Sequence, residues 1–168
     1  MMAMKSNFTP EQWARLLASP MVAGMAITAA DPSGLWGLLK EGLSGVQSIV
    51  EARQHPNALV KAVADELATN EGARTARDAM SAHVTSGPLE RLKAASLDEL
   101  RAVAALLDTK APAEDTAAFK AWLKEVAQKA AEAGTEGGFL GFGGVAVSDA
   151  EKATLAEIAR ALGSGVTA

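Results

Sequence analysis

Two histidines and the carboxylates around them are the residues that could hold a catalytic metal. A metal site inside a helical bundle usually combines carboxylates with Glu-x-x-His steps on facing helices. Neither His55 nor His83 has a glutamate three positions before it. Glu51 and His55 stand one helical turn apart, but Pro56 pushes the preceding residue out of helical geometry. We therefore predict surface or capping roles for both histidines and no metal site.

Nucleophilic catalysis has equally little support in the sequence. A Ser-His-Asp triad forms in space and needs no fixed spacing, but its local signature, G-x-S-x-G, does not occur. Residues 42–45, Gly-Leu-Ser-Gly, are one position too short for it. The chain also has no cysteine and no tyrosine, and its lysines and arginines are scattered. We expect no catalytic residue and no cofactor, so the sequence leans toward a non-enzyme.

Residues 137–149, GGFLGFGGVAVSD, are the most unusual segment, because glycines are threaded through large apolar side chains. Residues 141–146 formally match the dinucleotide fingerprint G-x-G-x-x-G/A. That fingerprint needs a strand before it, a helix opening inside it and a parallel sheet around it. We expect a helix before this segment and no parallel sheet, so the match is coincidental. No Lys-Ser/Thr pair follows the glycines, which also excludes a P-loop.

Three readings of this glycine-rich segment remain open. Residues 139–142 and 145–148 would form a β-hairpin if Gly143 and Gly144 made a two-residue turn. An irregular elbow packed on the domain would use the same residues, and a membrane-inserting tip would lack the usual basic flanks. If the segment functions beyond its structural role, we expect it to make contacts. The candidate contact surface consists of Trp36, Phe139, Phe142, Val145 and Val147.

Composition narrows the remaining classes of function. The chain has 168 residues, a net charge of −4 and interspersed acids and bases. Without a basic stripe and with few aromatic residues, we expect no nucleic-acid partner. The lack of cysteine fits a reducing compartment and the N-terminus shows no secretory signal, so we predict a cytoplasmic location. The longest apolar stretch, residues 21–30, is half a membrane span, so we consider a membrane location unlikely.

Proline and capping residues predict where the helices begin. Thr9, Ser19 and Asp31 each precede a proline, and a capping residue followed by proline is typical of a helix start. Ser96 and Ser148 each stand three positions before a glutamate, which is the pattern of a capping box. With the hydrophobic periodicity, these signals predict helices over residues 10–18, 20–30, 32–53, 57–69, 73–83 and 89–95, one opening at 96, one ending at 134, and one from 148 to 163.

The helix predicted over residues 32–53 is strongly amphipathic. At about 100° per residue, one broad arc of it collects the apolar side chains Leu35, Leu38, Leu39, Leu43, Val46, Ile49 and Val50. The opposite side carries Lys40, Ser44, Gln47 and Glu51. An arc of this width is typical of a helix that faces a core, so we expect these apolar residues to be buried.

Together these elements predict an all-α fold. We expect a single-domain multi-helix bundle over residues 1–168, with a short Gly/Phe-rich apolar loop or β-hairpin before the last helix. The N-terminus at residues 1–8 is expected to be flexible, residues 108–115 to form a polar connector, and residues 163–168 to be frayed.

The function that fits this reading best is a non-catalytic helical interaction or scaffold module. Its expected partner is a second copy of the chain or another protein. The alternative is a helical bundle that binds an apolar small molecule, such as a lipid chain, in a pocket closed between residues 21–50 and 139–147. An enzyme comes third.

Overall fold

The computed structural model describes residues 3–30, 42–84, 87–136 and 147–163. These residues form a short 3-10 helix and seven α-helices, and they contain no strand, so the predicted all-α fold is confirmed. The elements are η1 (Lys5–Asn7), α1 (Pro10–Ala30), α3 (Gly42–Ala52), α4 (Ala58–Leu67), α5 (Asn70–His83), α6 (Leu89–Lys110), α7 (Ala113–Glu136) and α8 (Asp149–Ala161).

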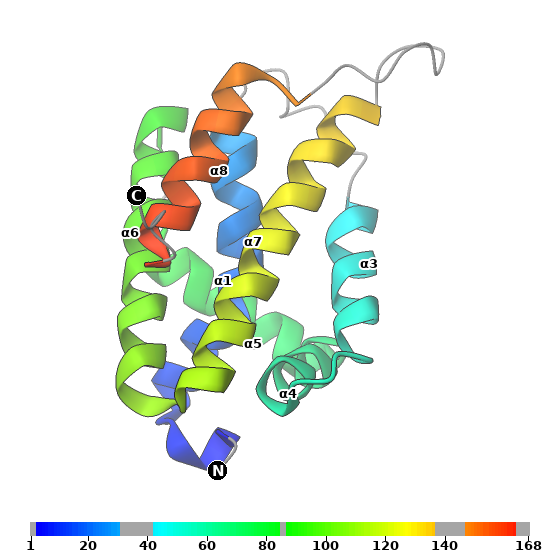
Figure 1. Ribbon diagram of the computed structural model, residues 1–168, viewed down its shortest axis with the longest axis vertical. Coiled ribbons are helices and arrows are strands. Elements are labelled where there is room, and N and C mark those ends of the chain that lie inside the picture. Colours follow the sequence, from blue (N-terminus) through cyan, green and yellow to red (C-terminus); the bar gives the residue numbers. More distant parts are fainter. Residues whose placement is uncertain (1–2, 31–41, 85–86, 137–146, 164–168) are drawn as a thin grey trace.

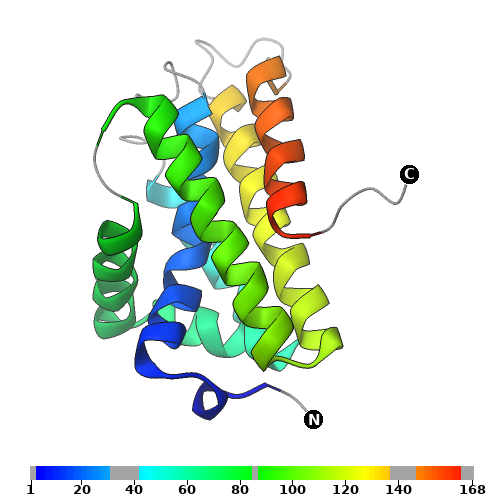
Figure 2. The same cartoon turned by 90° about the vertical axis from the view of Figure 1, so that its left-hand side faces the viewer.

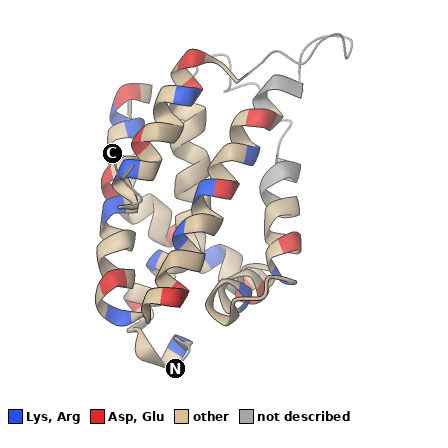
Figure 3. Ribbon diagram, in the orientation of Figure 1, with Lys and Arg blue, Asp and Glu red and all other residues tan. Residues whose placement is uncertain are grey.

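Helix α1 is the centre of the bundle. It contacts α5, α6, α7 and α8 along its length, and it also touches α3 and α4 (Figures 1 and 2). Helix α3 packs on α4 and α7, at the side of α7 away from α6 (Figure 1). Acidic and basic side chains alternate over the outer surfaces of the helices, as the sequence indicates (Figure 3). The core therefore surrounds α1, and α3 lies at its margin.

Helix α1 runs without a break through Pro20, where the sequence predicts two helices separated at Ser19. A proline inside a helix has no N–H to donate to the carbonyl four residues earlier, here that of Leu16. The Ser19 hydroxyl donates to the Leu16 carbonyl oxygen at 2.7 Å. The serine that resembles a helix cap therefore supplies the hydrogen bond that Pro20 cannot make, and the helix continues.

This continuous α1 is long and apolar enough to span a membrane by length and composition alone. However, 61% of its most apolar window is buried inside the protein, where it contacts the other helices. Core helices of soluble proteins pass the same test of length and composition. The burial of α1 is accounted for by its place in the bundle.

Helix α6 also continues through a predicted helix start. The Ser96 hydroxyl donates to the Leu92 carbonyl oxygen at 2.8 Å, and the Glu99 carboxylate accepts from Arg15 of α1 at 2.6 Å. Neither side chain is therefore available to cap a new helix at this point. At Ser148 the same pattern does form a capping box, which opens α8 as predicted.

Helix α5 begins at Asn70, earlier than the predicted start at residue 73, and Gly72 lies in its first turn. The side-chain oxygen of Thr69 caps α5 by accepting from the Gly72 N–H at 3.0 Å. A Cβ atom on Gly72 would lie 2.0 Å from the Glu66 carbonyl oxygen. Glycine at position 72 thus lets the first turn of α5 press against the end of α4.

Only residues 111–112 separate α6 from α7, so the connector is shorter than the polar segment expected over 108–115. Asp115 lies in the first turn of α7 and is 3% exposed. Its carboxylate accepts the backbone N–H of Ala3 and the side-chain amide of Asn57, the latter at 2.8 Å. The carboxylate therefore fixes the start of the chain and the cap of α4 to α7.

Several residues of the N-terminal segment expected to be flexible contact the bundle. Ala3 and Phe8 are buried, and the Phe8 ring lies 5.9 Å from that of Trp13. The Trp13 indole N–H and the Lys5 ammonium both donate to the Glu66 carboxylate. Residues 137–146, expected to form a loop or hairpin, and residues 164–168, expected to be frayed, lie outside the described residues.

Candidate functional site

The orientation of α3 differs from the one its sequence pattern predicts. Val46 and Val50, which belong to the arc expected in the core, are each 55% exposed. Ser48 and Ala52 are each 4% exposed and make up the buried side, and Ile49 is half-buried at its edge. The helix therefore turns small residues toward α7 and holds two valines, one turn apart, toward solvent.

The structure describes one residue of the predicted contact surface. Val147 is half-buried and packs against the core just before the capping box of α8. Trp36, Phe139, Phe142 and Val145 lie outside the described residues. The proposed grouping of these five side chains therefore stays a prediction.

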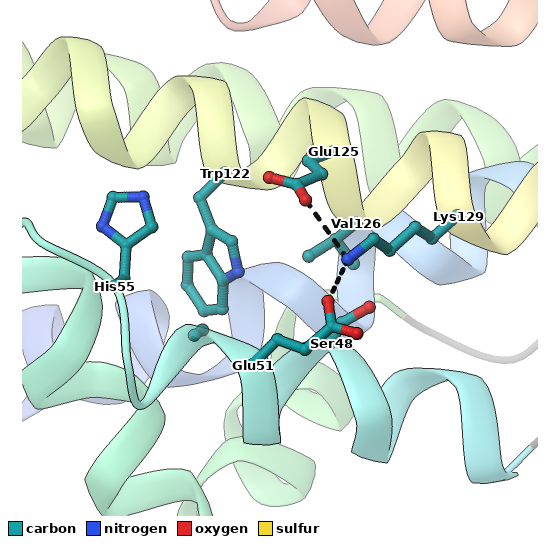
Figure 4. Close-up of a pocket in the computed structure, with 8 residues that line it drawn as sticks. Ser48, Glu51, His55, Trp122, Glu125, Val126 and Lys129 are labelled. Carbon is teal, nitrogen blue, oxygen red and sulfur yellow. Dashed lines mark hydrogen bonds and ion pairs between the residues drawn. The ribbon is translucent and has the colours of Figure 1, made fainter.

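A small pocket lies between α3 and α7 (Figure 4). It is on the side of α3 that carries Ser48 and Ala52, away from the exposed valines. Its volume is about 70 Å³. It is lined by Ser48, Glu51, Ala52, His55, Trp122, Glu125, Val126 and Lys129. The indole ring of Trp122, which meets Phe119 edge-on at a centroid distance of 5.3 Å, forms one wall.

An ion-pair chain crosses the mouth of this pocket. The Lys129 ammonium donates to the Glu51 carboxylate of α3 and pairs with Glu125 of its own helix at 3.2 Å. The hydrogen bond from Lys129 holds the pKa of Glu51 below its ordinary value, and the hydrogen bond to Glu51 raises the pKa of Lys129. Gln47 donates to the other oxygen of Glu51 at 3.1 Å. Both shifts favour the charged forms of the pair.

His55 follows α3 and turns its ring toward the same pocket. Its Nδ1 accepts the backbone N–H of Asn57 at 3.0 Å, so the neutral ring carries its proton on Nε2. Asn57 in turn caps α4 by accepting the N–H groups of Leu59 and Val60. His55 thus lies in the turn between α3 and α4, and the surface or capping role expected for it stays a prediction.

The second histidine belongs to a different cluster, where α1, α5 and α6 meet. The Glu99 carboxylate is buried and pairs with Arg15 at 2.6 Å, while His83 lies 3.8 Å from its other oxygen. His83 is 41% exposed by side chain. A buried carboxylate requires a charged or hydrogen-bonding partner, so Arg15 explains the burial of Glu99 without any catalytic role.

A wider and more open hollow of about 490 Å³ lies where α6, α7 and the end of α8 meet. Its two cations are Lys120 and Lys124, and Lys120 bonds to Asp108 at 2.7 Å. A Cβ atom built on Gly163, which ends α8 at a φ of 73°, would lie 3.6 Å from the Lys120 ammonium. Lys120 therefore lies close to the negative end of the α8 dipole, where a cation is stabilising.

Within the described ranges, no group of three His, Cys, Asp or Glu side chains is arranged to hold a metal ion. Sequence reasoning missed Ser48, Trp122 and Lys129 as residues of one pocket. Glu51 and Lys129 are 78 positions apart, and no local pattern connects them. The sequence contains one local signal of this pocket, which is a polar serine and a small alanine on the same side of an otherwise apolar helix.

Comparison with known proteins adds no assignment: no protein-family model, no curated protein and no solved structure matches the chain. The function must therefore be inferred from the residues described above.

Proposed function

We propose that the protein is a non-catalytic helical interaction module that associates with a second copy of itself through α3. The observation that supports this proposal is the orientation of α3. Val46 and Val50 are exposed on one side, while Ser48 and Ala52 take the buried side. Burying a valine side chain stabilises an interface by roughly 1.5 kcal/mol or more, so the exposed pair has a reason to be covered.

A second copy is the partner that the chemistry of α3 fits best. A symmetric contact brings the same face of both chains together, so two valines per chain form a row of four. The neighbouring ion pairs, Arg53 with Asp65 and Lys61 with Asp65, provide charges of both signs at the rim. Mixed charge at the rim suits contact with an identical surface, because neither copy presents a single sign.

The proposed location is the cytoplasm, in keeping with the expectation from composition. The alternative of an apolar ligand requires a larger space, since pockets for drug-sized molecules measure about 300–1,000 Å³. The pocket between α3 and α7 is about 70 Å³, and the open hollow of about 490 Å³ is lined in part by the charged side chains of Asp108, Lys120 and Lys124 rather than by an apolar wall. The loop expected to close over a lipid chain lies outside the described residues. Self-association is therefore the better-supported function.

Light scattering coupled to size-exclusion chromatography tests this proposal over a wide range of concentrations. The mass should rise from the 17.2 kDa of the monomer toward twice that value. The double variant Val46→Lys, Val50→Lys should stay monomeric with an unchanged circular dichroism spectrum, because both positions are exposed. Met4→Lys is the matched control, since Met4 is also an exposed apolar residue at 58%. A wild-type monomer at every concentration would refute the proposal.

A further inference from the structure

The indole nitrogen of Trp122 lacks a hydrogen-bond partner among the described residues. The side chain is only 4% exposed. Every fully buried side-chain nitrogen or oxygen in the described part of the chain has a partner, so this N–H must reach open space. Figure 4 shows the nitrogen on the edge of the ring that faces Lys129, inside the pocket between α3 and α7. The N–H is therefore free to donate to a molecule that enters the pocket.

Ser48 supplies a second donor from the opposite wall. Its side chain is 4% exposed, and its hydroxyl likewise has no partner within the described ranges. A serine in a helix often donates to the carbonyl four residues earlier, as Ser96 does in α6, but Ser48 makes no such bond. The two unpaired donors come from helices that lie far apart in the sequence, and they line the same small pocket.

The charge and the size of the pocket limit which molecules can bind to these two donors. Glu51 and Glu125 carry two negative charges against the single positive charge of Lys129. A further anion would enter against a net negative charge. A volume of about 70 Å³ exceeds the space of a single water, which needs about 10–15 Å³, yet holds only a few heavy atoms.

We infer that the pocket between α3 and α7 is a binding site for a small neutral molecule whose carbonyl oxygen accepts from Trp122 and Ser48. This site is independent of the proposed self-association, because Val46 and Val50 lie on the other side of α3. The lysine variants at those positions leave the pocket residues unchanged. The proposal of ligand binding can therefore be tested separately from the proposal of self-association.

Nuclear magnetic resonance of the full-length chain tests the site directly. The chain has three tryptophans and so three indole N–H signals, and Trp122→Phe identifies the one from the pocket. Acetamide is the probe, with acetate as an anion of the same shape. The Trp122 signal should shift saturably with acetamide, while the Trp13 signal stays in place because its N–H is already bonded to Glu66. Acetate should bind at least several-fold more weakly.

Two serine variants complete the test. Ser48→Ala should weaken acetamide binding several-fold by removing the second donor, whereas Ser81→Ala, at an exposed position of α5, should leave it unchanged. If acetamide moves the Trp122 signal no more than that of Trp13, the pocket holds water only and the inference is wrong. If acetate binds as tightly as acetamide, the assignment of a neutral ligand is wrong. If Ser48→Ala binds acetamide as tightly as the wild type, the assignment of Ser48 as a donor is wrong.

Discussion

Ser19 and Pro20 show how one side chain sets the length of the central helix. Proline normally ends or kinks a helix because it removes a hydrogen bond and crowds the preceding turn. In α1 the lost bond belongs to the Leu16 carbonyl, which is buried with its residue, and the Ser19 hydroxyl satisfies it. The pair Ser-Pro can therefore occur in two structural settings. The serine can cap a helix that begins at the proline, or it can lie inside a helix and donate the hydrogen bond that the proline cannot make.

Replacing Ser19 by alanine should lower the free energy of unfolding by about 1–3 kcal/mol, because the buried Leu16 carbonyl would lose its side-chain donor. Ser96→Ala is the matched control. Its hydroxyl also bonds a carbonyl, but that carbonyl already receives the Ser96 backbone N–H of the helix, so the cost should stay within about 0.5 kcal/mol. Urea unfolding followed by circular dichroism measures both changes. Equal losses in the two variants would contradict the repair role of Ser19.

At the scale of elements, local signals predicted helix content better than helix boundaries. Ser148 and Glu151 form the capping box that their spacing predicts, since nothing else competes for their side chains. Ser96 and Glu99 have the same spacing but lie inside α6, where Arg15 of another helix holds the glutamate. The difference depends on a residue 84 positions away, which no local pattern contains.

Glycine substitutions should have opposite effects in two helices. Gly72→Ala places a methyl group 2.0 Å from the Glu66 carbonyl oxygen, so α4 and α5 must separate at a cost of about 1–3 kcal/mol. Gly24→Ala, in the middle of α1, meets no atom within 4 Å and should stabilise the protein by about 0.5–1 kcal/mol. Thermal or denaturant unfolding distinguishes them, and a change of the same sign in both variants would contradict the close approach of α4 to α5.

The attachment of α3 to α7 should depend on pH through Glu51 and Lys129. The lowered pKa of Glu51 means that its contribution is complete above the ordinary glutamate value of 4.5 and is lost as the pH falls through the lowered one. The raised pKa of Lys129 means that its contribution is complete below the ordinary lysine value of 10.5 and is lost as the pH rises through the raised one. The pair therefore holds α3 most firmly between these limits.

Hydrogen exchange measured on Glu51→Gln and on the wild type at the same pH isolates this effect. At neutral pH the amides of α3 should exchange faster in the variant, and those of α6 should not change. In acid, below the pKa of Glu51, the two proteins should exchange alike. Equal exchange in α3 at neutral pH would show that the ion pair does not hold the helix.

At the scale of the whole molecule, the orientation of α3 is the feature that the sequence could not supply. The sequence predicts an apolar stripe along this helix, but a stripe alone does not say which neighbour covers it. Within the protein, Ser48 and Ala52 face α7, beside Trp122, and Val46 and Val50 remain exposed. Small residues of α3 lie where it meets α7, and periodicity contains no information about which residues meet a given neighbour. Four of the five predicted contact residues lie outside the described part of the chain. The proposal of self-association therefore rests on the exposed Val46 and Val50.

Crosslinking through one introduced cysteine tests self-association through α3 most directly, because the chain has no cysteine of its own. In a symmetric dimer whose two-fold axis passes through the paired valines, residue 50 of one copy lies close to residue 50 of the other. Val50→Cys treated with a short bismaleimide should give a covalent dimer in high yield, while Ser81→Cys on the exposed side of α5 should give little. Crosslinking of Val50→Cys no stronger than that of Ser81→Cys would contradict the account.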